Sequence, residues 1–158
     1  MRYINFSGEP AQTQDDFFMG EALKEAQKAL ELNEVPIGAV IVHGAKVIGR
    51  GHNLTEQLND VTAHAEVQAF TAATNYTGAK YLKECTLYVT IEPCVMCAGA
   101  SYWTQISRIV YGAADAKRGF SQISSRIIHP KTEVISGIRA EEAARLIKDF
   151  FLSKRNKT

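Results

Sequence analysis

The segments His64-Ala65-Glu66 and Pro93-Cys94-Val95-Met96-Cys97 constrain the fold of this chain more than any other feature. Together they offer one imidazole and two thiols, which are groups that bind zinc. Structural zinc sites close all four tetrahedral positions with protein atoms, whereas catalytic sites keep one position open for water or substrate. The motifs therefore predict a fold that brings two separate segments to one point, with Glu66 placed to handle the protons of a bound water.

The composition limits the class of protein. A length of 158 residues predicts one domain over residues 1–158, large enough to bury a hydrophobic core without support from disulfides or structural metals. A hydrophobic content of 46% with 22% charged residues is typical of a soluble globular protein. The net charge of +1 disfavours a strongly electrostatic nucleic-acid binder and leaves room only for a local basic patch.

The chain shows no sign of membrane insertion or secretion. No apolar run approaches the length of a membrane span, and the N-terminus lacks the apolar region of a signal peptide. Two of the three cysteines lie in one C-x-x-C, which favours metal or redox chemistry in a reducing compartment over a disulfide framework. We therefore expect a cytoplasmic protein with no membrane partner.

Strand and helix patterns alternate along the chain, with one hairpin, and predict an α/β sandwich built on a mixed sheet. The predicted strands cover residues 37–43, 46–51, 86–91, 106–111 and 132–138. Gly44-Ala45 is a glycine-first hairpin turn between the first two strands. Residues 112–131 form a long connection without periodicity, and such connections are usually functional or disordered.

Capping residues predict where the helices begin. Thr13 with Asp16 resembles a capping box that starts the first helix after a loose tail of residues 1–12, and this helix ends before Pro36. Thr62 would cap a second helix that runs to about residue 74, and Pro93 suits the first position of a third. The fourth helix covers residues 140–153, and its expected apolar side consists of Ala143, Ala144, Ile147, Phe150 and Phe151.

The spacing of the motif residues indicates how they could meet. Cys94 and Cys97 share one face of a first helical turn, where the positive end of the helix dipole favours thiolates. His64 and Glu66 diverge on a regular helix, so they converge only if His64 lies at the very start of its helix and Glu66 reaches round. Both helix starts would then point to one spot beyond the strand ends, where open α/β sheets usually bind ligands.

Two other interpretations of the cysteines stay open on the residues alone. A C-x-x-C pair can be a thioredoxin-like redox centre. A structural zinc site closed by a second histidine is the other, since His43, His52 and His129 are available. The remaining Cys85 is expected to be a buried structural thiol.

The order H-x-E then P-C-x-x-C is the pattern of zinc-dependent nucleobase deaminases. Beyond it, the chain resembles the tRNA adenosine deaminase (TadA) branch of the cytidine deaminase superfamily, through residues 35–40, 49–53, 62–66, 86–100 and 106–113. The resemblance implies a three-layer sandwich with a five-stranded mixed sheet flanked by helices, one Zn2+ per chain, no organic cofactor, and a homodimer with its sites near the interface. The implied reaction is hydrolytic conversion of the wobble adenosine to inosine in a tRNA anticodon stem-loop.

The resemblance also implies roles for single residues. His64, Cys94 and Cys97 match the zinc ligands, and Glu66 matches the residue that moves the proton to the leaving amine. Substrate contacts are implied at Asn53, the backbone N–H of Ala65, the carbonyl beside Pro93, the pocket side chains Ile37 and Ile91, and Asp115 near the ribose. We expect RNA phosphates at Lys117, Arg118, Lys154 and Arg155, although the last two also fit a solvated end of the chain.

Two departures from the family concern RNA contacts. Many members have arginine where this chain has Ala114, and many carry an Asn-His pair in a longer loop where His129-Pro130-Lys131-Thr132 leads directly into a strand. The alternative functions are a zinc deaminase of a free base or nucleoside (guanine, cytosine or adenosine) and a zinc-stabilised RNA-binding module. The extended similarity around Cys94 favours the tRNA deaminase over the first, and an intact Glu66 disfavours the second.

Overall fold

A five-stranded mixed sheet lies at the centre of the molecule. The computed structural model describes residues 11–156. The strands are β1 (Gly38–His43), β2 (Lys46–His52), β3 (Cys85–Ile91), β4 (Arg108–Ala113) and β5 (Glu133–Ser136). They lie in the order β2-β1-β3-β4-β5, in which β1 is antiparallel to β2 and β3, and β3, β4 and β5 run parallel. The predicted mixed sheet is confirmed, with strand ends displaced by a few residues.

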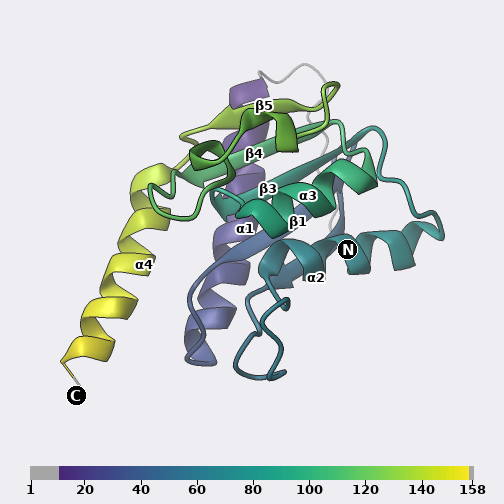
Figure 1. Cartoon of the computed structure of the whole chain (residues 1–158). Coiled ribbons are helices and arrows are strands. Elements are labelled where there is room, and N and C mark those ends of the chain that lie inside the picture. Colours follow the sequence, from purple (N-terminus) through teal and green to yellow (C-terminus); the bar gives the residue numbers. More distant parts are fainter. Residues whose placement is uncertain (1–10, 157–158) are drawn as a thin grey trace.

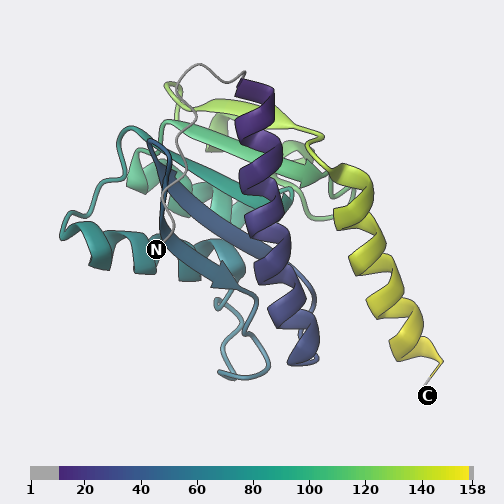
Figure 2. The same cartoon turned by 180° about the vertical axis from the view of Figure 1, so that it is seen from behind.

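Four helices cover the two faces of the sheet. They are α1 (Ala11–Glu31), α2 (Ala65–Thr77), α3 (Val95–Thr104) and α4 (Ala140–Arg155). Helices α2 and α3 lie on the face that is nearer in Figure 1, and α1 and α4 lie on the face that is nearer in Figure 2. Two short 3-10 turns, η1 (Phe120–Gln122) and η2 (Ser125–Ile127), order the long connection after β4. The arrangement confirms the three-layer sandwich.

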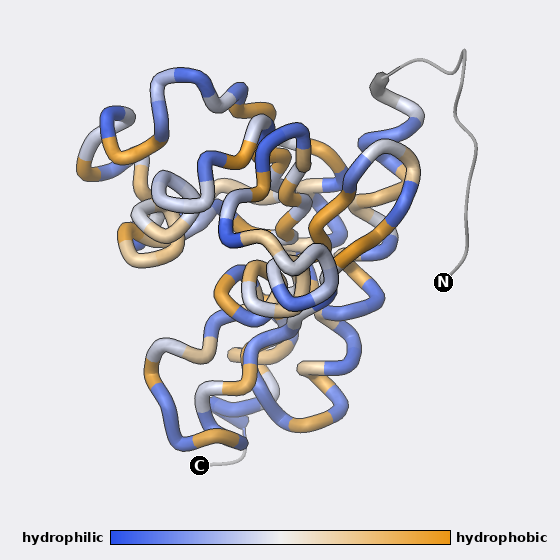
Figure 3. Tube along the Cα trace, turned by 90° about the vertical axis from the view of Figure 1, so that its right-hand side faces the viewer, coloured by the Kyte–Doolittle hydropathy of each residue, from blue (hydrophilic) through white to orange (hydrophobic). Residues whose placement is uncertain are grey.

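Strands β1, β3 and β4 are largely buried on both faces, so the core has two parts. Leu87 and Ile109 belong to the cluster beneath α2 and α3, whereas their neighbours Tyr88 and Val110 belong to the cluster beneath α1 and α4. This alternation follows from the strand pleat, which points successive side chains to opposite faces. Figure 3 shows hydrophobic and hydrophilic stretches following one another along the chain trace. No helix of the described part is both long and apolar enough to cross a membrane.

A polar network anchors α1 to the sheet. The buried Asp15 accepts a hydrogen bond of 2.7 Å from the Tyr88 hydroxyl and two of 3.1 Å from the Arg108 guanidinium. Burial, followed by the hydrogen bond to Asp15, raises the pKa of the Tyr88 hydroxyl. The network gives α1 a fixed position over β3 and β4.

Three predicted helix starts are wrong by two or three residues. Helix α1 begins at Ala11, so Thr13 lies inside it, and only residues 1–10 of the expected tail fall outside the described part. Thr62 does not cap α2, because its amide and hydroxyl both donate to Asp60 Oδ1, at 2.8 and 2.7 Å. Pro93 precedes α3 by two residues, and Cys94 takes the N-cap position. Capping preferences read from the sequence therefore placed these helix starts only approximately.

The apolar side of α4 is narrower than predicted. Ala143 and Phe150 are buried and Ile147 is half-buried, whereas Ala144 and Phe151 are exposed. In Figure 1 the outer turns of α4 extend past the edge of the sheet, which agrees with the exposure of Phe151 near the end of the helix.

Close contact between α2 and β2 depends on glycine. A Cβ atom at Gly51 would lie 2.3 Å from the Ala65 carbonyl oxygen, in the first turn of α2. Atoms at that distance overlap, so only glycine lets the start of α2 lie so near the end of β2. This contact positions the helix start that carries His64.

Candidate metal centre and substrate pocket

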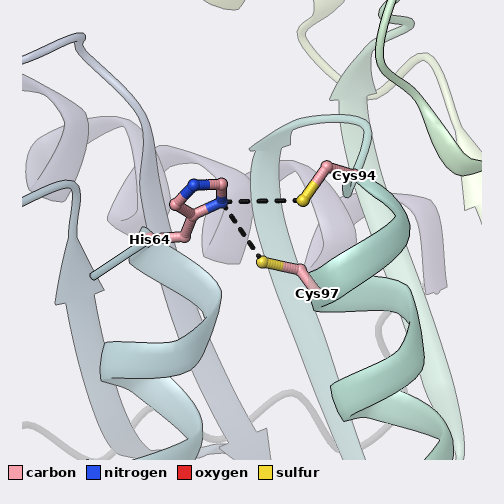
Figure 4. A group of neighbouring side chains, drawn as sticks. All are labelled: His64, Cys94 and Cys97. Carbon is pink, nitrogen blue, oxygen red and sulfur yellow. Dashed lines mark hydrogen bonds between the residues drawn. The ribbon is translucent and has the colours of Figure 1, made fainter. Parts of the chain in front are cut away.

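His64, Cys94 and Cys97 meet between the starts of α2 and α3 (Figure 4). The His64 Nδ1 atom lies 3.6 Å from Cys94 Sγ and 3.5 Å from Cys97 Sγ. A tetrahedral zinc with bonds of about 2.0–2.1 Å to nitrogen and about 2.3 Å to sulfur would separate these ligand atoms by about 3.6 Å. The three side chains are therefore arranged as zinc ligands, with Nδ1 as the nitrogen donor.

The backbone explains how these residues converge. His64 is the N-cap of α2 and has an extended conformation (φ −73, ψ 155), so its side chain is free of the helical path. Glu66 follows within the first turn, is 4% exposed, and its carboxyl is hydrogen-bonded with the Cys97 thiol. The condition for bringing His64 and Glu66 together, a histidine at the very start of its helix, is met.

The protonation of the site favours a cation. A hydrogen bond from Cys97 lowers the pKa of the Cys94 thiol to about 4, and the same bond raises the pKa of Cys97. Zinc binds both sulfurs as thiolates, so a bound zinc would displace the protons of these thiols. Burial, followed by repulsion from the Cys94 thiolate, raises the pKa of Glu66, which suits a group that must take up and release a proton.

No second histidine closes the site. His43 lies 3.9 Å from Glu84, His52 lies 3.6 Å from Glu25, and the His129 ring packs 5.1 Å from that of Tyr102. Among the described residues, the one group of three or more metal-binding side chains is His64, Cys94 and Cys97. The structure therefore contradicts a structural zinc closed by a second histidine as the fourth ligand. The expectation for Cys85 is confirmed, since this thiol is free and buried.

Two predicted substrate contacts lie in the loop after β2 and at the start of α2. Asn53 is buried in the loop after β2, where it donates to the Val35 carbonyl at 3.4 Å and accepts from the Thr55 amide at 3.3 Å. These bonds give Asn53 a role in the loop, so its contact with a base stays a prediction. Ala65 is the first residue of α2, so its N–H has no acceptor within the helix and points from the helix start.

The two predicted pocket side chains pack on different parts of the core. Ile37 packs against the cluster beneath α2 and α3, and Ile91 against the cluster beneath α1 and α4, with both half-buried. Pro93 is buried, and its carbonyl accepts a hydrogen bond of 2.9 Å from the Phe120 amide. A shared base pocket between Ile37 and Ile91 stays a prediction.

The predicted RNA contacts fall in two places. Asp115 Oδ1 accepts hydrogen bonds from the amides of Lys117 (3.0 Å) and Arg118 (2.9 Å), which brings these three into one turn with both cations exposed. Lys154 and Arg155 are exposed on the last turn of α4, where the Lys154 ammonium lies 5.4 Å from the Phe150 ring. Ala114 is exposed beside the Asp115 turn.

Glu34 and Glu92 are buried carboxylates that the sequence patterns missed. Glu34 is fully buried and accepts from the amides of Glu56 (3.2 Å) and Gln57 (2.6 Å) in the loop after β2. Glu92 is 4% exposed between β3 and α3. For Glu92 the available signal was a charged residue directly after a buried strand, which predicts either a ligand or a loop anchor. Glu34 lies between α1 and β1, so it carried no such signal.

Comparison with known proteins gives a consistent result. The family model described as MafB19-like deaminase matches residues 13–155. The tRNA-specific adenosine deaminase of Bacillus subtilis is 42% identical over 150 residues, which cover 92% of this chain and 93% of that one. The enzyme of the same name from Agrobacterium fabrum is 44% identical over 143 residues, covering 87% and 94%.

Solved structures agree. One, from a study of A-to-I editing by tRNA:A34 deaminases at the wobble position of transfer RNA, is 43% identical with a TM-score of 0.77, and the match covers 82% of this chain and 98% of that one. The guanine deaminase of Nitrosomonas europaea has a TM-score of 0.75 at 20% identity, over 94% of this chain and 86% of that one. At that identity the second match shows a common fold and nothing about the substrate.

Proposed function

Because the chain belongs to the tRNA-specific adenosine deaminase family, we propose that it hydrolyses the wobble adenosine of a tRNA anticodon to inosine and ammonia. The observation that carries the proposal is the convergence of His64, Cys94 and Cys97 beside the buried Glu66. A redox role for the C-x-x-C pair does not account for His64 and Glu66 at the same site. A zinc-stabilised binding module accounts for the three zinc ligands but not for Glu66.

We propose one Zn2+ per chain, held by His64 Nδ1 and the two cysteine sulfurs. When bound, the ion would lower the pKa of a water in its fourth position toward about 7 and so supply the nucleophile. Glu66 would accept a proton as the water oxygen bonds to C6 of adenine and would deliver a proton to the amine nitrogen on C6, so that the C6–N bond breaks and ammonia leaves while the oxygen stays on C6. Burial keeps bulk water from competing for this proton.

The polar atoms around the site would hold the base. The free N–H of Ala65 at the start of α2 is a donor for the reacting edge, and the carbonyl of Pro93 has a second lone pair left for an amine. Asn53 would pair with the purine, and Ile37 and Ile91 would contact its faces. These assignments follow the family pattern and are part of the proposal.

RNA binding would add the affinity that one base lacks. Asp115 would contact the ribose side of the substrate, and Lys117 and Arg118 extend from the same turn. Lys154 and Arg155 offer a second cationic place on α4. If single-stranded phosphates bind here, log affinity falls by about 0.7 per log unit of salt for each contact.

We also propose that the chain forms a homodimer through the α3 side of the sandwich. Exposed apolar side chains gather there, with exposed fractions of 76% for Trp103, 48% for Val95 and 39% for Tyr102. Val61, 83% exposed, lies on the loop that leads to His64. Large apolar side chains in such positions are typical of an interface, and it would lie next to the metal centre. Light scattering of wild type and Trp103→Glu tests this, and a wild-type monomer at micromolar concentration would contradict it.

The compartment follows from the proposed substrate and chemistry. Cys85, Cys94 and Cys97 are free thiols, which persist in a reducing compartment, and tRNA editing takes place where tRNA is. We therefore propose a cytoplasmic enzyme that uses no organic cofactor.

The deciding experiment compares an anticodon stem-loop containing the wobble adenosine with free adenosine, cytidine and guanine at equal concentration and moderate salt. We expect inosine in the stem-loop and little or no turnover of the free compounds. Glu66→Ala is the matched inactive control. Efficient turnover of a free base with no inosine in RNA would instead identify a base or nucleoside deaminase.

A further inference from the structure

Glu92 is a buried carboxylate that the proposed mechanism does not use. It follows β3 and precedes Cys94 by two residues. Its Oε1 atom accepts a hydrogen bond from the Asp115 amide at 3.2 Å, and its Oε2 atom accepts from the amide (3.0 Å) and the hydroxyl (2.7 Å) of Ser121. All three donors belong to residues 114–121, so one carboxylate holds this segment near both of its ends.

Gly119 leaves room for this carboxylate. A Cβ atom there would lie 2.3 Å from Cδ and Oε2 of Glu92 and 2.5 Å from Oε1. The φ of Gly119 is −62, which any residue adopts, so the glycine is required by space and not by backbone conformation. The segment therefore closes directly over the carboxylate.

Main-chain contacts join the same two segments. The Glu92 amide donates to the Ala113 carbonyl at 2.8 Å, and the Phe120 amide donates to the Pro93 carbonyl at 2.9 Å. Cys94 and Gly119 form an isolated β-bridge. Residues 114–121 are thus attached to the turn that carries a metal-binding thiol.

The outward side of the segment carries the predicted RNA contacts. Asp115 Oδ1 accepts from the amides of Lys117 and Arg118, and the Gly119 amide donates to the Asp115 carbonyl at 3.0 Å. This compact turn leaves the Lys117 and Arg118 side chains exposed. The buried side of the turn faces Glu92, and its exposed side faces solvent.

We propose that Glu92 is a positioning residue for RNA binding, which fastens residues 114–121 to the metal-side turn so that Asp115, Lys117 and Arg118 form a preformed contact surface. The inference rests on the proposed function, because it assumes an RNA substrate. A surface that is already ordered binds RNA without first losing the conformational freedom of the segment. Loosening the segment should therefore weaken substrate binding more than it slows the chemical step.

The test is Glu92→Gln, which keeps the size of the side chain and turns one acceptor oxygen into an NH2 group facing N–H donors. We expect KM for the stem-loop to rise about tenfold, the size of effect that follows from leaving buried donors unpaired, with kcat within about threefold of wild type. Zinc content should stay at one per chain. An unchanged KM, or a loss of zinc, would overturn the proposal.

Asp15→Asn is the matched control. Asp15 is also buried and also accepts three hydrogen bonds, but it belongs to α1, on the other face of the sheet. This variant should lose thermal stability without a change in KM. An equal rise of KM in both variants would assign the effect to general loosening of the fold and refute a specific role for Glu92.

Two further measurements separate this inference from the proposed function. Combining Glu92→Gln with Asp115→Ala should raise KM by less than the product of the single effects, because both act through one segment. Amide hydrogen exchange at Gly119, Phe120 and Ser121 should be at least about tenfold faster in Glu92→Gln, whatever the substrate. Unchanged exchange would refute the positioning role, whereas faster exchange in a protein that edits no RNA would refute only the proposed substrate.

Discussion

Replacing Gly51 by alanine tests whether the contact between β2 and α2 sets the metal geometry. The new Cβ atom would lie 2.3 Å from the Ala65 carbonyl oxygen, 2.6 Å from the Ala69 amide nitrogen and 2.7 Å from Gln68 Cβ. Two of these atoms belong to the helix backbone, which has no rotamer to change. The strand and the helix must therefore separate.

The size of the movement follows from these distances. An ordinary contact of about 3.4 Å or more requires the 2.3 Å pair to open by about 1 Å. His64 directly precedes Ala65, so it would move by a similar amount relative to Cys94 and Cys97. Metal–ligand distances tolerate about 0.2 Å, so His64 would stop acting as a ligand. Changes outside the ligand set already cost about 10- to 100-fold in metal affinity, and we expect a loss of at least about 100-fold here.

The assay is zinc stoichiometry after equilibration with a graded chelator, together with thermal unfolding. Overpacking costs about 1–3 kcal/mol, which for a chain of this size lowers Tm by roughly 2–12 °C. Gly99→Ala is the matched control, because a Cβ atom there meets nothing within 4 Å and alanine favours the α3 helix. That variant should keep its zinc and unfold at the same temperature or slightly higher.

A Gly51→Ala protein that keeps one zinc at wild-type affinity would refute the reasoning. It would mean that β2 moves outward as a free edge strand while α2 stays in place. Asn53, which follows β2, would then be displaced in place of His64, and activity would fall without loss of metal.

The other predictions concern the chemistry and the packing. Glu66→Ala should lower kcat by at least about 10²–10⁴-fold with one zinc retained, and metal analysis showing zinc loss would make Glu66 a ligand instead. Asn53→Ala should lower kcat/KM with unchanged metal content; a destabilised variant whose folded fraction is fully active would leave the bonds to Val35 and Thr55 as its only role. Glu34→Gln should lower stability by about 1–3 kcal/mol in chemical denaturation, since it leaves buried amides of the loop after β2 poorly paired, and an unchanged unfolding midpoint would count against this. Removing zinc with a chelator should abolish deamination and adding Zn2+ should restore it, whereas activity without metal would contradict the proposed site.

The sequence was most informative where residue chemistry limited geometry. The spacing of Cys94 and Cys97, and the requirement that His64 start its helix, predicted a meeting of two helix starts, and the structure has it. The strands were also predictable, because runs of β-branched and aromatic residues bounded by turn residues are typical of β-strands. The helix starts were less predictable. Thr62, for example, donates its amide and hydroxyl hydrogen bonds to Asp60 and does not cap the helix that follows.

Contacts between distant segments were not predictable from local patterns. Nothing near Glu92 in the sequence indicates that its partners are Asp115 and Ser121, because the pairing depends on the path of the chain after β4. The same holds for Gly51. A side chain is excluded at this position by α2, which begins only after the loop that follows β2. The roles of Glu92 and Gly51 depend on contacts with residues that are distant in the sequence, and nothing in their local sequence indicates these contacts.

Helix α4 leaves the body of the molecule after Phe150, and every described residue beyond it is exposed. The buried ring that this outer part contacts is that of Phe150, which lies 5.3 Å from the Phe151 ring and 5.4 Å from the Lys154 ammonium, and none of the three metal-binding side chains belongs to α4. Mutation can therefore alter Lys154, Arg155 and the length of the helix at little risk to folding or to the chemical step. Under the proposed RNA contacts at Lys154 and Arg155, the range of RNAs bound could change separately from the reaction, and laboratory evolution of new substrates could begin at this helix.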